Sequence, residues 1–247
     1  MPVALKTVNT RRLRSAEWTW ATTSGHCEIC GDNNAVSVPD LKRLADLAEV
    51  QTLGRDAVLI REGDPAPHIF NVSHGSLRVF KQLPDGRRQI TGFLFAGDFL
   101  ALVVGETYEF SAEAMESSII RRFRKGPFRA LVEQSRSLEH MLLHRTSHEL
   151  VAAQNQMLLL GRKTAIERVA SFLLDLPAHD PARPTAAGHV RLPMKRREIA
   201  DYLGMTVETV SRVLTRLRAG GIIAMPRKGE LVVALPERLR RHAEGKV

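Results

Sequence analysis

Three side chains near the C-terminus have the types and spacing needed to read DNA bases. Glu208, Ser211 and Arg212 share one face if residues 206–218 are helical. An arginine fork fits guanine O6 and N7, a carboxylate accepts from cytosine N4, and a serine approaches bases or a thymine methyl. Glu208 and Arg212 are also spaced for an ion pair that orients the guanidinium. The alternative is a surface salt bridge with no part in base reading.

The neighbouring sequence predicts the elements that would position these side chains. Residues 196–203 form a short amphipathic helix, Gly204 permits a tight turn, and Thr206 is a good N-cap for a second helix to about Arg218. Two strand-like runs, 222–225 and 230–235, then flank a basic hairpin tip. Four apolar residues would form the buried stripe of the second helix: Val210, Val213, Leu214 and Leu217. The order predicts a winged helix-turn-helix domain over residues 162–240.

Charge places a polyanion-binding surface in the same region. Residues 161–247 hold 17 Lys or Arg against 9 Asp or Glu, so 17 − 9 = +8 of the total net charge of +9 lies there. Such a surface binds phosphates with release of counterions, although a merely solvated basic domain is the alternative explanation. The side chains expected to contact the DNA backbone or support the base-reading set are Thr206, Thr209, Arg216, Arg227 and Lys228. We therefore expect double-stranded DNA as a partner.

The preceding segments predict an α+β chain with a β-domain and a long helix. Short apolar runs separated by Gly and Asp turns indicate an antiparallel β-roll over residues 36–130. Residues 131–161 are expected to form a dimerisation helix. Its a/d seam comprises Leu143, Leu150, Ala153, Met157 and Leu160, together with Thr146. The seam predicts a homodimer, and the alternative is packing of these residues on the protein's own β-domain.

The N-terminal arm, residues 1–35, contains the only two cysteines, Cys27 and Cys30. Two thiols are too few for a disulfide framework, which favours a reducing, cytoplasmic location, and no apolar run is long enough for a membrane span. The Cys-x-x-Cys spacing supplies half of a zinc or iron–sulfur site, or a thiol–disulfide switch. We predict no cofactor and no metal ligands, and keep Cys27 and Cys30 as the weak candidates.

Two stretches resemble the CRP/FNR superfamily of bacterial transcription regulators. Residues 197–212 are similar to the family's helix-turn-helix, and their Glu-x-x-Ser-Arg spacing is typical of its FNR and FixK branches. Residues 89–98 resemble the β-roll of the FNR branch. The resemblance implies a cyclic-nucleotide-binding-domain-like roll and a homodimer in which Glu208, Ser211 and Arg212 read TTGA-type inverted repeats. It also implies activation by contact with RNA polymerase, with the 83–88 turn as a candidate surface.

Departures from the family's patterns indicate how the protein would be regulated. An FNR-type cluster needs four thiolates, whereas only Cys27 and Cys30 are present and the region of Ile120 holds no cysteine. In the stretch matching the family's cyclic-nucleotide site, no arginine precedes Ser111, and Glu106 and Glu109 would repel a phosphate. We therefore expect no cyclic nucleotide and a FixK-like regulator of microaerobic, anaerobic or nitrogen-fixation genes.

Two alternatives to this function stay open. One is a redox- or iron–sulfur-responsive regulator that uses Cys27 and Cys30. The other is a cupin-like metalloenzyme in the β-roll, for which His68 and His74 are the central candidates. Because these histidines lack a His-x-His pair with a following glutamate, we predict that the protein is not an enzyme.

Overall fold

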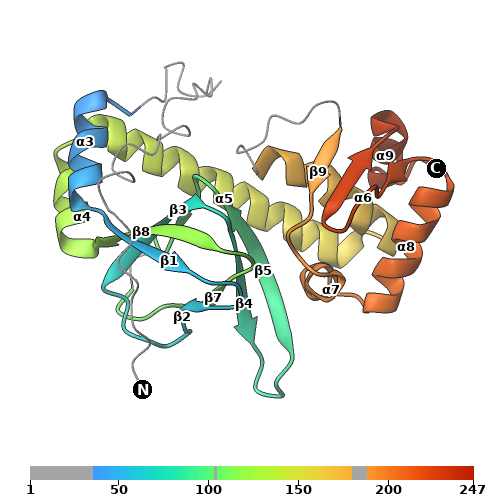
Figure 1. The fold of residues 1–247 in the computed structure, drawn as a ribbon, viewed down its shortest axis with the longest axis horizontal. Coiled ribbons are helices and arrows are strands. Elements are labelled where there is room, and N and C mark those ends of the chain that lie inside the picture. Colours follow the sequence, from blue (N-terminus) through green and yellow to red (C-terminus); the bar gives the residue numbers. More distant parts are fainter. Residues whose placement is uncertain (1–35, 103–104, 180–187) are drawn as a thin grey trace.

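The computed structural model describes residues 36–102, 105–179 and 188–247, and Figure 1 shows their arrangement. A β-domain lies at one end, a long helix runs past it, and a second, smaller domain lies at the other end (Figure 1). The arm over residues 1–35, with the weak candidate ligands Cys27 and Cys30, lies outside the described residues. The α+β class and the order of domains are confirmed.

The β-domain is a roll of two antiparallel four-stranded sheets, ordered β1-β8-β3-β6 and β2-β7-β4-β5. Its strands are β1 (Glu49–Leu53), β2 (Val58–Ile60), β3 (His68–His74), β4 (Ser76–Gln82), β5 (Arg88–Phe95), β6 (Phe99–Leu100), β7 (Ser111–Ala114) and β8 (Ser118–Arg124). Buried side chains such as Phe70, Val72, Leu77 and Ile120 form the core of the roll. The hairpin β4–β5 extends beyond the core of the roll. Residues 76–80 of β4 are buried, whereas residues 81–87, which include the turn, are exposed.

Three helices accompany the roll: α3 (Val38–Leu47), α4 (Lys125–Glu133) and α5 (Arg136–Arg162). The prediction of strand-like structure from residue 36 onward is wrong at α3, which begins after an N-cap at Ser37 whose hydroxyl accepts from the Asp40 N–H. The predicted helix boundary at residue 131 falls inside α4, because Ser135 caps a new helix by accepting from the Leu138 N–H. The two early helices pack with the start of α5 around Phe123, Phe128 and Leu138.

The C-terminal domain contains four helices and one small antiparallel sheet among its described residues. The helices are α6 (Ala165–His179), α7 (Arg196–Leu203), α8 (Val207–Ala219) and α9 (Pro236–Ala243). The strands are β9 (His189–Arg191), β10 (Ile223–Ala224) and β11 (Glu230–Val233), in the order β10-β11-β9. Helix α9, which the sequence analysis missed, contributes the buried residues Leu239 and Ala243 to the domain's core.

Candidate nucleic-acid interface

The turn between α7 and α8 sets the direction of the second helix. Gly204 ends α7 with φ 61°, in the left-handed region where an L side chain is strained, so glycine suits this position. Thr206 then caps α8, because its hydroxyl accepts from the Thr209 N–H at 3.2 Å. Val210, Leu214 and Leu217 are buried, whereas Val213 is only half-buried. The inner stripe thus leaves the opposite face of α8 to solvent.

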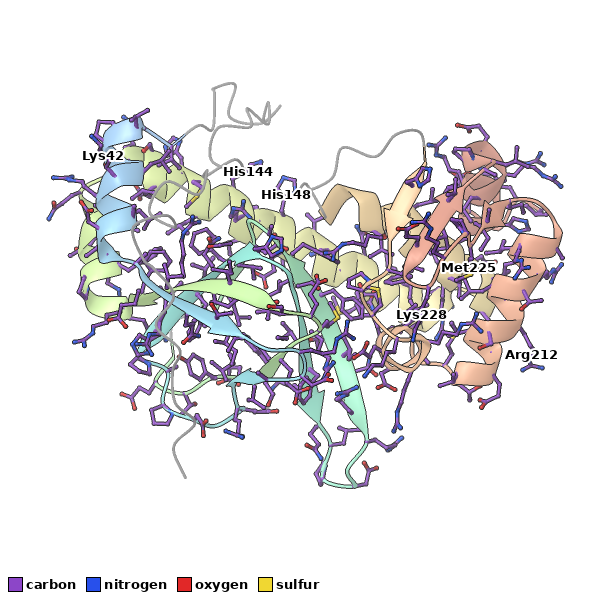
Figure 2. The ribbon with its side chains drawn as sticks, in the orientation of Figure 1. Lys42, His144, His148, Arg212, Met225 and Lys228 are labelled. Carbon is purple, nitrogen blue, oxygen red and sulfur yellow. The ribbon has the colours of Figure 1, made fainter. Side chains whose placement is uncertain are left out.

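That outer face holds the predicted base-reading residues. Glu208 and Arg212 are exposed and Ser211 is half-buried, while Thr215 and Arg216 continue the polar face. Figure 2 shows Arg212 at the outer edge of the molecule. The geometry therefore brings a carboxylate, a hydroxyl and a guanidinium together on one exposed helix face, as direct reading of base edges requires.

Hydrogen bonds on this face differ from the sequence-based expectation. The Arg212 guanidinium donates to the Thr209 hydroxyl at 3.4 Å, and among the described contacts no ion pair joins it to Glu208. Arg196, which the sequence analysis missed, donates to the Ser211 hydroxyl at 3.2 Å from the start of α7. Arg196 is the first residue of the first predicted helix, and this position is the sequence signal that could have placed its side chain near the second helix.

The predicted wing is present between β10 and β11. These strands pair Ile223 with Val233 and Ala224 with Val232, and β9 adds a third strand on the other side of β11. Both cations of the tip, Arg227 and Lys228, are exposed. They lie on the same small domain as α8, and their role as phosphate contacts stays a prediction.

Most of the predicted seam on α5 is open in the single subunit. Leu143, Leu150 and Met157 are 67%, 60% and 66% exposed, and Ala153 is exposed too. Leu160 differs, since it is half-buried against the core of the C-terminal domain. Leu143, Leu150, Ala153 and Met157 therefore form an exposed apolar row on α5, whereas Leu160 packs in part on the C-terminal domain of its own chain.

A buried charged cluster fastens the C-terminal domain to the roll. Arg78 on β4 and Glu198 on α7 are 8% and 5% exposed, and their Nη1 and Oε1 atoms are 2.5 Å apart. Arg78 also pairs through Nη2 with Glu113 at 2.5 Å and Asp56 at 3.0 Å. We call these four residues the Arg78 cluster. Burial alone lowers the pKa of Arg78, but the hydrogen bonds that its guanidinium donates to Glu113 and Asp56 raise the pKa above the ordinary value, so the cation is held firmly.

Further contacts extend this interface on both sides of the Arg78 cluster. Arg191 donates to both Glu116 carboxylate oxygens at 2.7 Å, and Arg88 pairs with Asp201 at 3.3 Å. The centroids of the Phe93 and Tyr202 rings also lie 5.2 Å apart, and burial raises the pKa of Tyr202 to about 12. Sequence reasoning missed the interface because its charges are scattered over the chain and acquire a common site only in the fold.

Comparison with known proteins identifies the fold and its class. A Crp-like helix-turn-helix domain matches residues 167–242, and a cyclic nucleotide-binding domain matches residues 50–135. The nitrogen fixation regulation protein FixK of Bradyrhizobium diazoefficiens is 39% identical over 209 residues, which cover 82% of this chain and 88% of that protein. The chain belongs to the CRP/FNR family of transcription regulators.

Other members support the same assignment. The transcriptional activator protein anr of Pseudomonas aeruginosa is 36% identical over 212 residues, covering 83% of this chain and 87% of that protein. The solved structure of FixK2 from Bradyrhizobium japonicum superimposes with a TM-score of 0.73 at 37% identity, covering 78% of this chain and 96% of that one. The protein is thus a DNA-binding transcription regulator, and proteins of this family act as dimers.

The remaining candidate residues lie apart. His68 and His74 are six residues apart on one strand, which separates them by about 20 Å. In the described ranges, no group of three or more His, Cys, Asp or Glu side chains converges to hold a metal. Cys27 and Cys30 are not described. Among the helices that the structure describes, none is long and apolar enough to cross a membrane.

Proposed function

We propose that this regulator binds inverted repeats of TTGA-type half-sites as a homodimer, with Glu208, Ser211 and Arg212 reading the bases. The single observation that carries the proposal is the outer face of α8, where these three side chains are close together and free of ion pairs within the described chain. Thr206, Thr209, Arg216, Arg227 and Lys228 would hold the backbone or support the reading residues. The names of two relatives, nitrogen fixation regulation protein and transcriptional activator protein, favour activation of nitrogen-fixation genes.

The exposed apolar row on α5 supports the dimer. An isologous contact between two α5 helices would bury Leu143, Leu150, Ala153 and Met157 against their copies. In a TTGA-N6-TCAA site the half-site centres are ten base pairs apart, about one turn of DNA or roughly 34 Å. Two α8 helices related by a two-fold axis would then enter successive major grooves on one side of the duplex.

Activity without a cyclic nucleotide is part of the proposal. The Ser111 hydroxyl accepts from the Glu62 N–H at 3.0 Å, and Glu106 and Glu109 are exposed in the same loop. These carboxylates disfavour a bound phosphate. Contact with RNA polymerase would use exposed loops such as the β4–β5 turn at residues 83–87. We expect the regulator to have no cofactor and no catalytic reaction.

Fluorescence anisotropy of the metal-free, full-length protein tests the proposal. It is titrated at one physiological salt concentration against a TTGA-N6-TCAA duplex and a scrambled duplex of equal length, because affinity for DNA depends strongly on salt. We expect tight binding to the palindrome alone. Equal, weak binding to both duplexes would contradict effector-independent recognition. A duplex with an N11 spacer, which rotates one half-site to the opposite side of the DNA, is the matched control and should bind like the scrambled one.

A further inference from the structure

Helix α5 carries three histidines at four-residue intervals, namely His140, His144 and His148. Side chains four apart on a helix lie one above the other. At about 100° per residue, positions 144 and 148 are rotated by about 100° and 140° from Leu143, so they lie outside the apolar row. His144 is half-buried and His148 exposed, and Figure 2 shows both on the same side of α5.

Two of these three histidine rings, those of His144 and His148, already lie close together. The Nε2 atoms of His144 and His148 are 3.1 Å apart, and the ring centroids are 4.3 Å apart. A metal bound by two imidazoles at about 2.0–2.1 Å holds their nitrogens about 2.9 Å apart at a right angle and about 3.4 Å apart at the tetrahedral angle. The observed separation lies between these values. An ion bound by both rings would lie to one side of the line that joins the two nitrogens. The rings must therefore rotate to direct their lone pairs at it, while the separation of the nitrogens can stay near its present value.

We propose that His144 and His148 form a two-ligand site for a divalent d-block cation, whose other coordination positions are filled by water. Histidines at i and i+4 on one helix are an established way to grip such an ion. Imidazole ligands suit Cu²⁺, Ni²⁺ and Zn²⁺, and two nitrogens with water favour Cu²⁺ over Ni²⁺ and Zn²⁺. Residues 145–147 are Arg-Thr-Ser, so the site lacks the glutamate of a metal hydrolase.

Binding of an ion here would stabilise a part of α5 that has few packing contacts with the rest of its own chain. Residues 146–155 are all exposed in the single subunit, so this stretch of helix has little packing from its own chain. An ion that joins residues one turn apart fixes that turn in the helical conformation. Because the ion binds the folded form, it stabilises the protein as its concentration rises.

Isothermal titration calorimetry with Ni²⁺ and Cu²⁺ tests the site. The full-length protein is used with Cys27 and Cys30 both replaced by Ser, so that thiols do not bind the metal. We expect one ion per subunit. His144→Gln should weaken binding at least about tenfold, since it leaves His140 and His148 about 12 Å apart along the helix. His140→Gln, the matched control, keeps the converging pair and should bind like the background protein.

Two further measurements separate loss of the site from loss of structure. Gln is a good helix former, so the far-ultraviolet circular dichroism of His144→Gln should match the background. The rise in Tm with added Ni²⁺ should be present in His140→Gln and absent in His144→Gln. Cu²⁺ bound to the background should give an electron paramagnetic resonance spectrum with two nitrogen ligands. The proposal is overturned if His144→Gln binds as tightly as the background, if both variants lose binding equally, or if the background binds no metal.

Discussion

The two helices of the helix-turn-helix carry charged side chains into opposite surroundings. On α7, Glu198 is buried and bound by Arg78 from the roll, and its other oxygen accepts from the Lys195 N–H at 2.5 Å. On α8, Glu208 and Arg212 are exposed, and the guanidinium has only the Thr209 hydroxyl at 3.4 Å as a described partner. The residue types are the same, whereas burial and pairing differ.

This difference indicates what each face is for. A buried carboxylate is tolerated only when a cation and hydrogen bonds replace its lost water, so the Arg78 cluster must be complete for the domain to sit against the roll. Exposed charges that form no ion pair keep most of their water at little cost, and they remain available to a ligand from outside the chain. Burial and pairing thus fit the Glu198 side of α7 to the roll, whereas the outer face of α8 keeps the exposure that the proposed contact with DNA would need.

Arg78→Met should give the largest effect. It leaves Glu198 buried without its guanidinium, and breaking a buried pair by removing one partner costs about 3–5 kcal/mol. The free energy of unfolding from a urea titration measures the loss. Arg87→Met is the matched control, because Arg87 pairs with Asp85 in an exposed turn and its removal should change stability little.

A double variant sharpens this test. Glu198→Gln removes the buried charge, so Arg78→Met combined with Glu198→Gln should be more stable than Arg78→Met alone. A loss in Arg78→Met no larger than in Arg87→Met would mean that the Arg78 cluster does not hold the two domains together. The buried charge on α7 would then have no special role in holding the protein together, and the contrast with α8 would be lost.

The apolar row on α5 is a second face that the chain leaves open, and Leu150→Glu tests it. Burying a leucine contributes about 1.5–3 kcal/mol, and a two-fold contact loses two of them. We expect the dimer to weaken by about 3 kcal/mol or more and to appear as monomer in sedimentation velocity. Leu83→Glu, on the exposed β4–β5 turn, should leave the dimer intact. A dimer unchanged by Leu150→Glu would show that another surface closes it.

Elements with a local signal were predictable from the sequence, and contacts between distant elements were not. Gly204 predicts the turn and Thr206 the N-cap of α8, and the three- and four-residue spacing of apolar residues predicts the apolar row on α5. Helix α3 was missed although Ser37 and Pro39 mark its start, because short apolar runs nearby resemble strands. In the Arg78 cluster, Arg78 and Glu198 are 120 positions apart in the sequence, so no local pattern reveals their contact.

Arg212→Ala should weaken binding to the palindrome by about 1–3 kcal/mol if the guanidinium pairs with guanine. Discrimination should relax at one base pair per half-site, because the other reading residues stay in place. Anisotropy titrations against duplexes with single substitutions in the half-site measure both effects. Arg218→Ala, an exposed cation at the C-terminal end of α8, serves as control and should keep the base preference. Equal losses on all duplexes would make Arg212 a phosphate contact.

Arg227→Ala should have the smallest effect and a different signature. A wing cation that meets a phosphate binds every sequence, so affinity for the palindrome and the scrambled duplex should fall by similar factors. Each neutralised phosphate contributes about 0.9 to the slope of log affinity against log salt, and a dimer carries two copies of Arg227. The slope should therefore become shallower by about 2, as measured by titrations at several salt concentrations. An unchanged slope with an altered base preference would mean that Arg227 contacts a base and not a phosphate, so that the wing as well as α8 reads the sequence.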